Sequence, residues 1–220
     1  ANQNKTYQRE LLITIVISFS GTVNFTTGEI IANACLIISK CVKCLTFCIL
    51  IIGPNGSGKT TILRAVAGLI DPEEGEVTWN NELISNDIQS YYEHMTWISH
   101  LHGFKSNLSI NDNLAFEAAL FGYDHTEISS TINDLSLIAD SHKPFKTLSA
   151  GQKKRAALSR LLLEKKPLWL LDEPTSNLDK SAQQQLLDMI DSHINNNGMC
   201  IMATHQPELF NDVSSIIELS

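Results

Sequence analysis

The chain has 220 residues, of which 43% are hydrophobic and 18% charged, and its formal net charge is -8 at pH 7. This composition supplies enough apolar material for a folded core and carries too little charge for a disordered chain. The acidic excess argues against a general nucleic-acid-binding protein, because such proteins neutralise phosphates with many cationic side chains.

Two apolar runs near the N-terminus raise the question of a membrane span. The run at 11–20 is short, and the longer run at 35–52 contains Lys40 and Lys43. A spanning helix needs about 20 apolar residues with few or no charges, so we expect neither run to cross a membrane. Glu10 beside the first run, and a poor cleavage context after it, also argue against a secretory signal.

Four of the five cysteines lie within residues 35–48, where Cys41 and Cys44 have the spacing of a metal or redox pair. No second ligand pair of matching spacing accompanies them, so we expect reduced thiols packed as small hydrophobic side chains. We treat residues 1–48 as an atypical N-terminal region, predicted to contain β-structure, and residues 49–220 as the main domain.

From residue 49 onward, short apolar runs alternate with segments whose apolar residues recur at helical spacing. Strands are predicted at 49–52, 76–80, 168–171, 199–203 and 213–219, and helices at 61–69, 113–121, 127–139, 150–164 and 181–194, the last capped by Asp179. The alternation predicts an α/β fold with a mainly parallel sheet. The helical block at about 100–165 interrupts it, and we expect this block to form a helical subdomain.

A glycine-rich turn follows the strand predicted at 49–52. The sequence Gly53-Pro54-Asn55-Gly56-Ser57-Gly58-Lys59-Thr60 matches G-x-x-x-x-G-K-[ST] at each required position. Such a loop surrounds a phosphate with backbone N–H groups, and the helix after it directs its positive end at the anion. Lys59 can reach the β- and γ-phosphates, and Thr60 can ligate Mg²⁺. The predicted nucleotide contacts in this segment are these loop residues and Thr61, which follows them.

Two acids end the strand predicted at 168–171. Asp172 can hold the Mg²⁺ shell at the sheet edge, and Glu173 can polarise an attacking water as a general base. The alternative is a helix N-terminus with favourable acids, because Pro174 comes next. The phosphate loop in the same chain favours the catalytic interpretation.

Two weaker candidates lie on either side of these acids. Ser149 is expected to cap a helix, and Gly151 to leave the backbone open to an approaching anion. The basic run at 153–155 is interpreted as a solvated helix face. His205 follows the strand predicted at 199–203, on the side of the sheet where α/β folds bind ligands. It can hydrogen-bond a γ-phosphate or be structural.

Together these features resemble the ATP-binding subunits of ABC transporters over about residues 49–208. The matching segments are the Walker A loop at 53–60, the signature motif at 148–152, the Walker B strand and catalytic glutamate at 168–173, the D-loop at 176–179 and the switch histidine at 205. Ala150 stands where glycine is commoner in the signature motif. The resemblance implies a P-loop NTPase fold and ATP and Mg²⁺ as cofactors.

The resemblance also implies a head-to-tail homodimer that binds ATP between the Walker A loop of one copy and the signature motif of the other. It makes Ser149, Gly151 and Gln152 nucleotide contacts in trans. It makes Lys59, Glu173 and His205 catalytic residues, and Thr60 and Asp172 metal ligands.

A narrower resemblance is to the ATP-binding subunits of cytochrome c biogenesis haem exporters. It depends on the sequences LSAGQ and PLWLLDEP and on the segment 103–105. It implies integral membrane subunits of a haem-export complex as partners, contacted by the helical subdomain, and no nucleic acid. The implied location is peripheral, on the cytoplasmic face of a bacterial inner membrane or the matrix face of a mitochondrial inner membrane.

One departure from the family pattern lies between the two lobes. Family members carry a glutamine there, which joins the Mg²⁺ shell and senses the γ-phosphate. This chain has His100 or Leu101 in that place, depending on the alignment. Leucine cannot ligate a metal, and imidazole is softer than Mg²⁺ prefers.

The N-terminal region departs further. The family's Gly-Glu pair lies a few residues before the phosphate loop, whereas Gly28 and Glu29 lie far upstream of it here. Either an insertion occupies about 31–47 or the first 48 residues come from an altered frame. The adenine-stacking aromatic residue is also unassigned, and the candidates are Tyr7, Phe19 and Phe25.

Three functional hypotheses remain open. The leading one is an ATPase subunit that drives an exporter, in haem export for cytochrome c maturation or in another small ABC transporter. The second is an ATP-gated dimerising module with little hydrolysis. The third, a nucleic-acid or ribosomal ABC-type ATPase, is disfavoured by the net charge of -8 and the single cassette.

Overall fold

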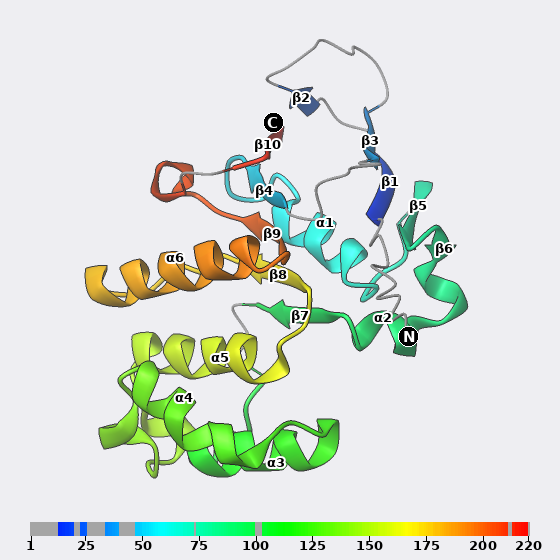
Figure 1. Ribbon diagram of the computed structural model, residues 1–220. Helices are drawn as coiled ribbons and strands as arrows, with labels where there is room; N and C mark the ends of the chain where they lie inside the picture. Colours follow the sequence, from blue (N-terminus) through cyan, green and yellow to red (C-terminus); the bar gives the residue numbers. More distant parts are fainter. Residues whose placement is uncertain are drawn as a thin grey trace, which may run out of the picture.

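The computed structural model describes residues 13–19, 23–25, 34–39, 47–72, 74–99, 103–210 and 213–219. Within these residues the chain forms a six-stranded and a four-stranded sheet with helices packed around them (Figure 1). In spatial order, the strands of the larger sheet are β2 (Val23–Phe25), β10 (Ser215–Leu219), β4 (Phe47–Ile52), β9 (Met199–Ala203), β8 (Leu168–Asp172) and β7 (Met95–Ile98). Neighbouring strands from β10 to β7 run parallel, and β2 pairs antiparallel with β10.

The central strands are apolar because both faces of the sheet are covered. All five residues of β8 and all five of β9 are buried. This is the pattern of a parallel sheet between helical layers. Residues of β4 alternate between two cores, with Ile49 and Ile51 in the core that includes α1 (Lys59–Val66). Leu50 packs in the other core, with α5 (Ala150–Glu164) and α6 (Lys180–Asn195).

The smaller sheet is antiparallel and covers the α1 side of the molecule. Its strands, in spatial order, are β3 (Ala34–Ser39), β1 (Ile13–Phe19), β5 (Glu74–Trp79) and β6 (Glu82–Leu83). Val77 and Trp79 of β5 join the core around α1. A short helix, α2 (Ile88–Tyr92), is fixed to α1 by a 2.8 Å hydrogen bond from the Tyr91 hydroxyl to the Val66 carbonyl.

Between β7 and β8 the chain forms a helical lobe with a core of its own. The lobe contains α3 (Ile110–Phe121), α4 (Ile128–Asp134) and the first part of α5, and its core includes Leu114, Ile132 and Phe145. Ser109 caps α3 through a capping box with Asp112, which satisfies backbone N–H groups at the helix start. Short 3-10 helices lie at Ile84–Asn86, His125–Glu127, Ile138–Asp140, Phe145–Thr147 and Pro207–Leu209.

The predicted α/β fold with a mainly parallel sheet and a helical lobe is confirmed. The helix predicted at 127–139 is wrong in its second half. The α4 helix ends at Asp134, and Ser136 then has a positive φ of 54°, which breaks the helix before the 3-10 turn at Ile138–Asp140. The helix α2 and the edge strand β7 were not predicted from the sequence.

Among the described residues, every helix is too short or too polar to cross a bilayer. The longest of them, α6, has 16 residues, whereas a span needs about 20.

Candidate active site

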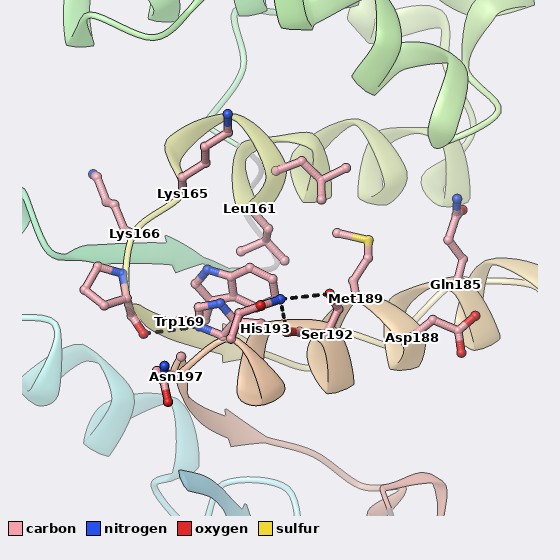
Figure 2. A pocket seen from close by; sticks show the side chains of 14 residues that line it. Leu161, Lys165, Lys166, Trp169, Gln185, Asp188, Met189, Ser192, His193 and Asn197 are labelled. Carbon is pink, nitrogen blue, oxygen red and sulfur yellow. Dashed lines mark hydrogen bonds between the residues drawn. The ribbon is translucent and has the colours of Figure 1, made fainter. Parts of the chain in front are cut away.

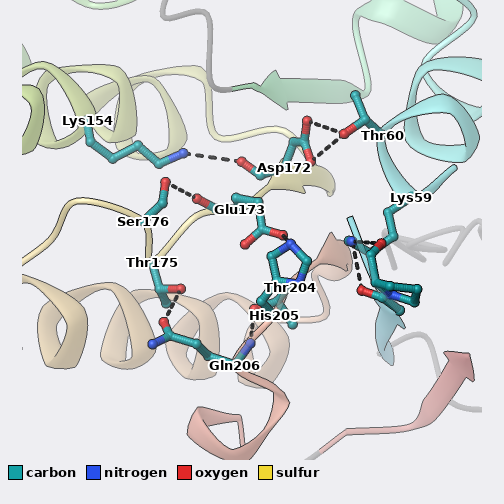
Figure 3. A network of polar contacts seen from close by, with 12 residues as sticks. Lys59, Thr60, Lys154, Asp172, Glu173, Thr175, Ser176, Thr204, His205 and Gln206 are labelled. Atoms are coloured by element: carbon teal, nitrogen blue, oxygen red, sulfur yellow. Dashed lines mark hydrogen bonds and ion pairs between the residues drawn. The ribbon is translucent and has the colours of Figure 1, made fainter. Parts of the chain in front are cut away.

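The parallel order β4, β9, β8 brings three chain segments to one edge of the sheet. Gly53 follows the end of β4, Asp172 and Glu173 lie at the end of β8, and His205 comes two residues after β9. The carboxyl edge of parallel strands is where open α/β sheets bind ligands. Figure 3 shows the side chains of these segments directed into one polar cluster.

The loop between β4 and α1 requires glycine at three positions. Gly53, Gly56 and Gly58 have φ values of 150°, 83° and 98°, which side-chain-bearing residues rarely adopt. A Cβ on Gly53 would also lie 2.5 Å from the Leu219 carbonyl oxygen and 2.8 Å from Ser57 Oγ. The loop therefore keeps its backbone free around the start of α1, whose N-cap is Gly58.

Polar groups inside this loop are available to an anion. Ser57 Oγ is buried without a hydrogen-bond partner among the described residues. Lys59 is 7% exposed, and its Nζ donates to the carbonyl oxygens of Gly53 and Pro54 at 2.9 and 3.0 Å. An ammonium held by neutral carbonyls beside a helix N-terminus is suited to a phosphate. The remaining predicted contacts, Asn55, Gly56 and Thr61, are exposed.

Thr60 and Asp172 lie against each other. The Thr60 hydroxyl donates to both Asp172 carboxylate oxygens, at 3.1 and 3.0 Å, and Asp172 is 2% exposed. Hydroxyl and carboxylate oxygens are hard ligands of the kind Mg²⁺ takes, usually together with waters and substrate phosphates. No group of three or more His, Cys, Asp or Glu side chains suited to a metal occurs in the described ranges. The oxygens of Thr60 and Asp172 are hard donors of the kind that a magnesium ion takes.

Glu173 has a strained backbone and an unsatisfied carboxylate. Its φ is 47°, a value that a non-glycine residue keeps only where neighbours hold it. Its Oε1 is buried and receives no well-formed hydrogen bond from the described residues, although His205 Nε2 lies 3.2 Å away. The side chains of His205 and Glu173 are 42% and 25% exposed, so both are partly open to solvent. The pair can accept a proton from a water and hold an anion nearby.

Ser149 and Gln152 form a capping box at the start of α5. Ser149 Oγ accepts from the Gln152 N–H at 3.2 Å, and Gln152 Oε1 accepts from the Ser149 N–H at 2.7 Å. Gln152 Nε2 also donates to Asp140 at 2.5 Å. The predicted cap at Ser149 is confirmed. These residues lie at an exposed helix start, where backbone N–H groups can meet an anion.

Gly151 has a structural reason to lack a side chain. A Cβ at this position would lie 2.7 Å from the Asn177 carbonyl oxygen. The segment that contains Asn177 follows the acids of β8, and Asn177 itself has a φ of 61°. Gly151 therefore allows the start of α5 to approach this segment closely, in addition to the open backbone expected for an anion.

The prediction of a solvated basic face at 153–155 is wrong at its central residue. Lys154 is 1% exposed, and its Nζ donates to the Asp172 carbonyl oxygen at 3.3 Å. Burial lowers the pKa of Lys154 to about 8, and the charges of Asp172 and Glu173 oppose this change. Its position three residues before Ala157 placed it on the apolar stripe of α5, and that spacing was the signal for its burial.

Several predicted positions lie outside the described residues. These are His100 and Leu101 between the lobes, Tyr7, Gly28 and Glu29 near the N-terminus, and the Cys41–Cys44 pair. Phe19 and Phe25 lie in β1 and β2, of which only the backbone is described. Cys48 and Cys200 are buried free thiols, as expected, and burial raises the pKa of Cys48 to about 12.

A separate cavity of about 700 Å³ lies between α5, α6 and the start of β8, away from the polar cluster (Figure 2). His193 and Trp169 form part of its wall, and their rings stack in parallel with centroids 3.7 Å apart. His193 Nε2 faces the carbonyl oxygens of Pro167 and Met199 at 3.2 and 3.3 Å. The Nε2 atom of His193 therefore hydrogen-bonds the backbone next to the starts of β8 and β9.

The chain is similar in sequence to proteins of one family. Residues 47–176 match the family model described as "ABC transporter". The chain is 40% identical over 156 residues to the cytochrome c biogenesis ATP-binding export protein CcmA of Bordetella bronchiseptica, covering 70% of each chain. It is 38% identical to the proteins of that name in Pseudomonas aeruginosa, covering 72% of this chain and 79% of the relative, and Yersinia pestis, covering 74% and 78%.

Solved structures share the fold. A dimeric ATP-binding cassette in a post-hydrolysis state, bound to ADP and Pi, has a TM-score of 0.73 at 21% identity, covering 96% of this chain and 94% of its own. An ATP-binding subunit of an ABC transporter has a TM-score of 0.75 at 21% identity, covering 95% and 85%.

Proposed function

The chain belongs to the ABC transporter family of ATP-binding proteins, and we propose that it binds ATP with Mg²⁺ and hydrolyses it to drive a membrane-embedded export partner. The observation that carries this proposal is the cluster at the carboxyl edge of the sheet. There the Thr60–Asp172 pair lies next to Glu173, whose buried Oε1 atom faces His205.

In the proposed mechanism, each residue has a role that follows from its position. Lys59 leaves the loop carbonyls and binds the terminal phosphates with the loop N–H groups, which stabilises the transferring charge. Thr60 and Asp172 would hold Mg²⁺, which neutralises charge on the β- and γ-phosphates when bound. Glu173 accepts the proton of the attacking water, and His205, whose Nε2 lies 3.2 Å from Glu173 Oε1, donates to the γ-phosphate beside that carboxylate.

We further propose that two copies complete each site. The start of α5, where Ser149 and Ala150 are exposed and Gly151 carries no side chain, suits the phosphates of a nucleotide held by a second copy. Gln152 holds Ser149 in place through the capping box. A solved cassette of the same fold is a dimer bound to ADP and Pi, which supports a homodimer for this chain.

The finer assignment is haem export in cytochrome c maturation, at the cytoplasmic or matrix face of a membrane. Its support is the 40% identity to a cytochrome c biogenesis ATP-binding export protein. The helical lobe offers a surface for the membrane partner, because α3 exposes Phe116, Leu120 and Phe121 by 46%, 62% and 60%. Exposed aromatic and aliphatic side chains clustered on one helix mark an interaction surface.

Two measurements on the purified chain test the ATPase. We expect Glu173→Gln to keep ATP binding, measured by equilibrium dialysis with labelled nucleotide, and to lose most phosphate release, because the amide cannot accept the proton. The exposed Glu208→Gln serves as the matched control and should hydrolyse at the parental rate. Parental turnover by Glu173→Gln would show that the base is another group. Nucleotide uptake without phosphate release from the unaltered chain and its membrane partners would favour the ATP-gated module.

The haem-export assignment is tested in the source organism. Deletion of the gene should reduce covalently bound haem in membrane cytochromes c, and the unaltered chain should restore it while Glu173→Gln should not. Normal haem attachment in the deletion strain would assign the ATPase to another small ABC transporter.

A further inference from the structure

Lys154 is a charged side chain enclosed by the protein. It lies on α5 with 1% of its surface exposed, on the stripe that packs Ala157, Leu158 and Leu161 against the sheet. Burying an ammonium is costly unless it is paired or hydrogen-bonded. Figure 3 shows its side chain extending to the end of β8, where Nζ lies 3.3 Å from the Asp172 carbonyl oxygen. The buried ammonium thus donates to the peptide group that follows Asp172.

That peptide group joins the proposed metal ligand to the proposed general base. Glu173 directly follows it and has a φ of 47°, a conformation that must be held by surrounding contacts. The Glu173 N–H donates to the Ala203 carbonyl oxygen at 2.9 Å, and the Ser176 hydroxyl donates to the Glu173 carbonyl oxygen at 2.8 Å. Lys154 supplies the contact on the N-terminal side of this turn.

The charge of Lys154 has a second effect. Asp172 and Glu173 are adjacent carboxylates, and like charges this close repel each other. The Lys154 ammonium interacts favourably with both of them. It therefore offsets the repulsion between the two side chains in this turn.

Lys154 also connects this turn to the start of α5. It lies five residues after Ser149 on the same continuous helix. Two residues further along the helix, Ala156 packs in the core of the helical lobe, whereas Ala157 packs in the core of the sheet. Movement of α5 relative to the sheet would therefore reach the Asp172–Glu173 peptide through the Lys154 side chain.

We propose that Lys154 is a positioning residue for ATP hydrolysis, which ties the helix beginning at Ser149 to the turn that holds Glu173. The proposal rests on the ATPase function proposed above. Lys154 acts through the backbone of the turn and needs no contact with nucleotide or water.

Steady-state kinetics give the first test. Lys154→Met keeps the length and apolar stem of the side chain but removes the ammonium, and we expect kcat to fall about tenfold or more because Glu173 loses its alignment. KM for MgATP should stay within about threefold, because the phosphate loop is unchanged. Lys154→Arg restores a cationic donor and should recover most of the lost turnover. Lys153→Met, at a half-buried neighbour that contacts Lys146, is the matched control.

Amide hydrogen exchange gives a test that does not depend on turnover. In Lys154→Met, the Glu173 and Ser176 amides should exchange faster, while those of β9 and α6 stay as in the parental chain. If Lys154→Met fails to fold, Lys154→Gln, which keeps a polar donor without the charge, should change both measurements in the same direction.

The outcomes separate the two proposals. Parental kcat or unchanged exchange in the turn for the Lys154 variants would overturn the positioning role and leave the ATPase proposal intact. A parental chain that binds no nucleotide and releases no phosphate would overturn the ATPase proposal, and the exchange comparison would still decide whether Lys154 holds the turn.

Discussion

The Thr60 hydroxyl donates to both carboxylate oxygens of Asp172, at 3.1 and 3.0 Å, although the two residues are 112 positions apart in the chain. The contact joins the first turn of α1 to the end of β8. Both side chains are thereby held in place before any metal arrives, which lowers the ordering cost of binding one.

Removing the charge of Asp172 should specifically weaken the affinity for magnesium. In Asp172→Asn the amide is a poorer ligand for a hard cation, so the Mg²⁺ concentration at half-maximal phosphate release should rise about tenfold or more. Binding of ATP in the presence of EDTA should change little, because the phosphate contacts proposed for Lys59 and the loop are unaltered. Asp188→Asn on α6 is the control. An unchanged magnesium titration would remove Asp172 from the metal site.

The ring nitrogen Nε2 of His205 should contribute to the rate of ATP hydrolysis. This atom lies 3.2 Å from Glu173 Oε1, so His205→Ala removes the ring nitrogen that we propose to donate to the γ-phosphate beside the base. We expect kcat to fall about tenfold to a hundredfold with little change in ATP binding. The exposed His142→Gln should leave turnover unaltered. Equal rates for His205→Ala and the parental chain would make His205 structural.

The bounds of helices and strands were predicted best where capping residues and apolar spacing indicated the same element. The α5 helix begins and ends as predicted, because the Ser149–Gln152 capping box marks its start and its apolar spacing is regular. The strand β9 was predicted with the observed bounds, since its buried residues form one apolar run. In contrast, β7 has four residues, and its pairing with β8 is what makes it a strand.

Features that depend on distant contacts could not be predicted in the same way. The burial of Lys154 depends on the Asp172 carbonyl, which β8 brings to α5 from 18 residues along the chain. The close approach at Gly151 depends on the Asn177 carbonyl in a turn after β8. The spacing of Lys154 before Ala157 indicates a buried position, but nothing local in the sequence identifies the carbonyl partner of either residue.

Gly151→Ala tests this close approach. The new Cβ would lie 2.7 Å from the Asn177 carbonyl oxygen, so the backbone of one segment must shift. We expect a loss of about 1–3 kcal/mol in the free energy of unfolding, as for other overpacked sites. Urea denaturation measures it, and Ala150→Ser at the exposed neighbouring position is the control. Full stability of Gly151→Ala would show that the 176–179 segment moves aside easily.

His193 should make the fold less stable in acid. Burial lowers the pKa of His193 below its ordinary value of 6.5, so between the two values the unfolded chain binds the proton and the folded chain does not. The stabilisation is therefore complete above pH 6.5 and is lost as the pH falls through the folded-state pKa. The charged groups that line the cavity beside the ring are Lys165, Lys166 and Asp188.

His193→Gln keeps an N–H donor for the Pro167 and Met199 carbonyls, but its amide does not take up a proton between pH 7.5 and 5. It should lower stability at pH 7.5 through loss of the stack on Trp169, and it should flatten the decline in stability between pH 7.5 and 5. Urea midpoints across this range measure the slope, and the exposed His125→Gln should keep the parental slope. A parental slope in His193→Gln would assign the acid sensitivity to other groups.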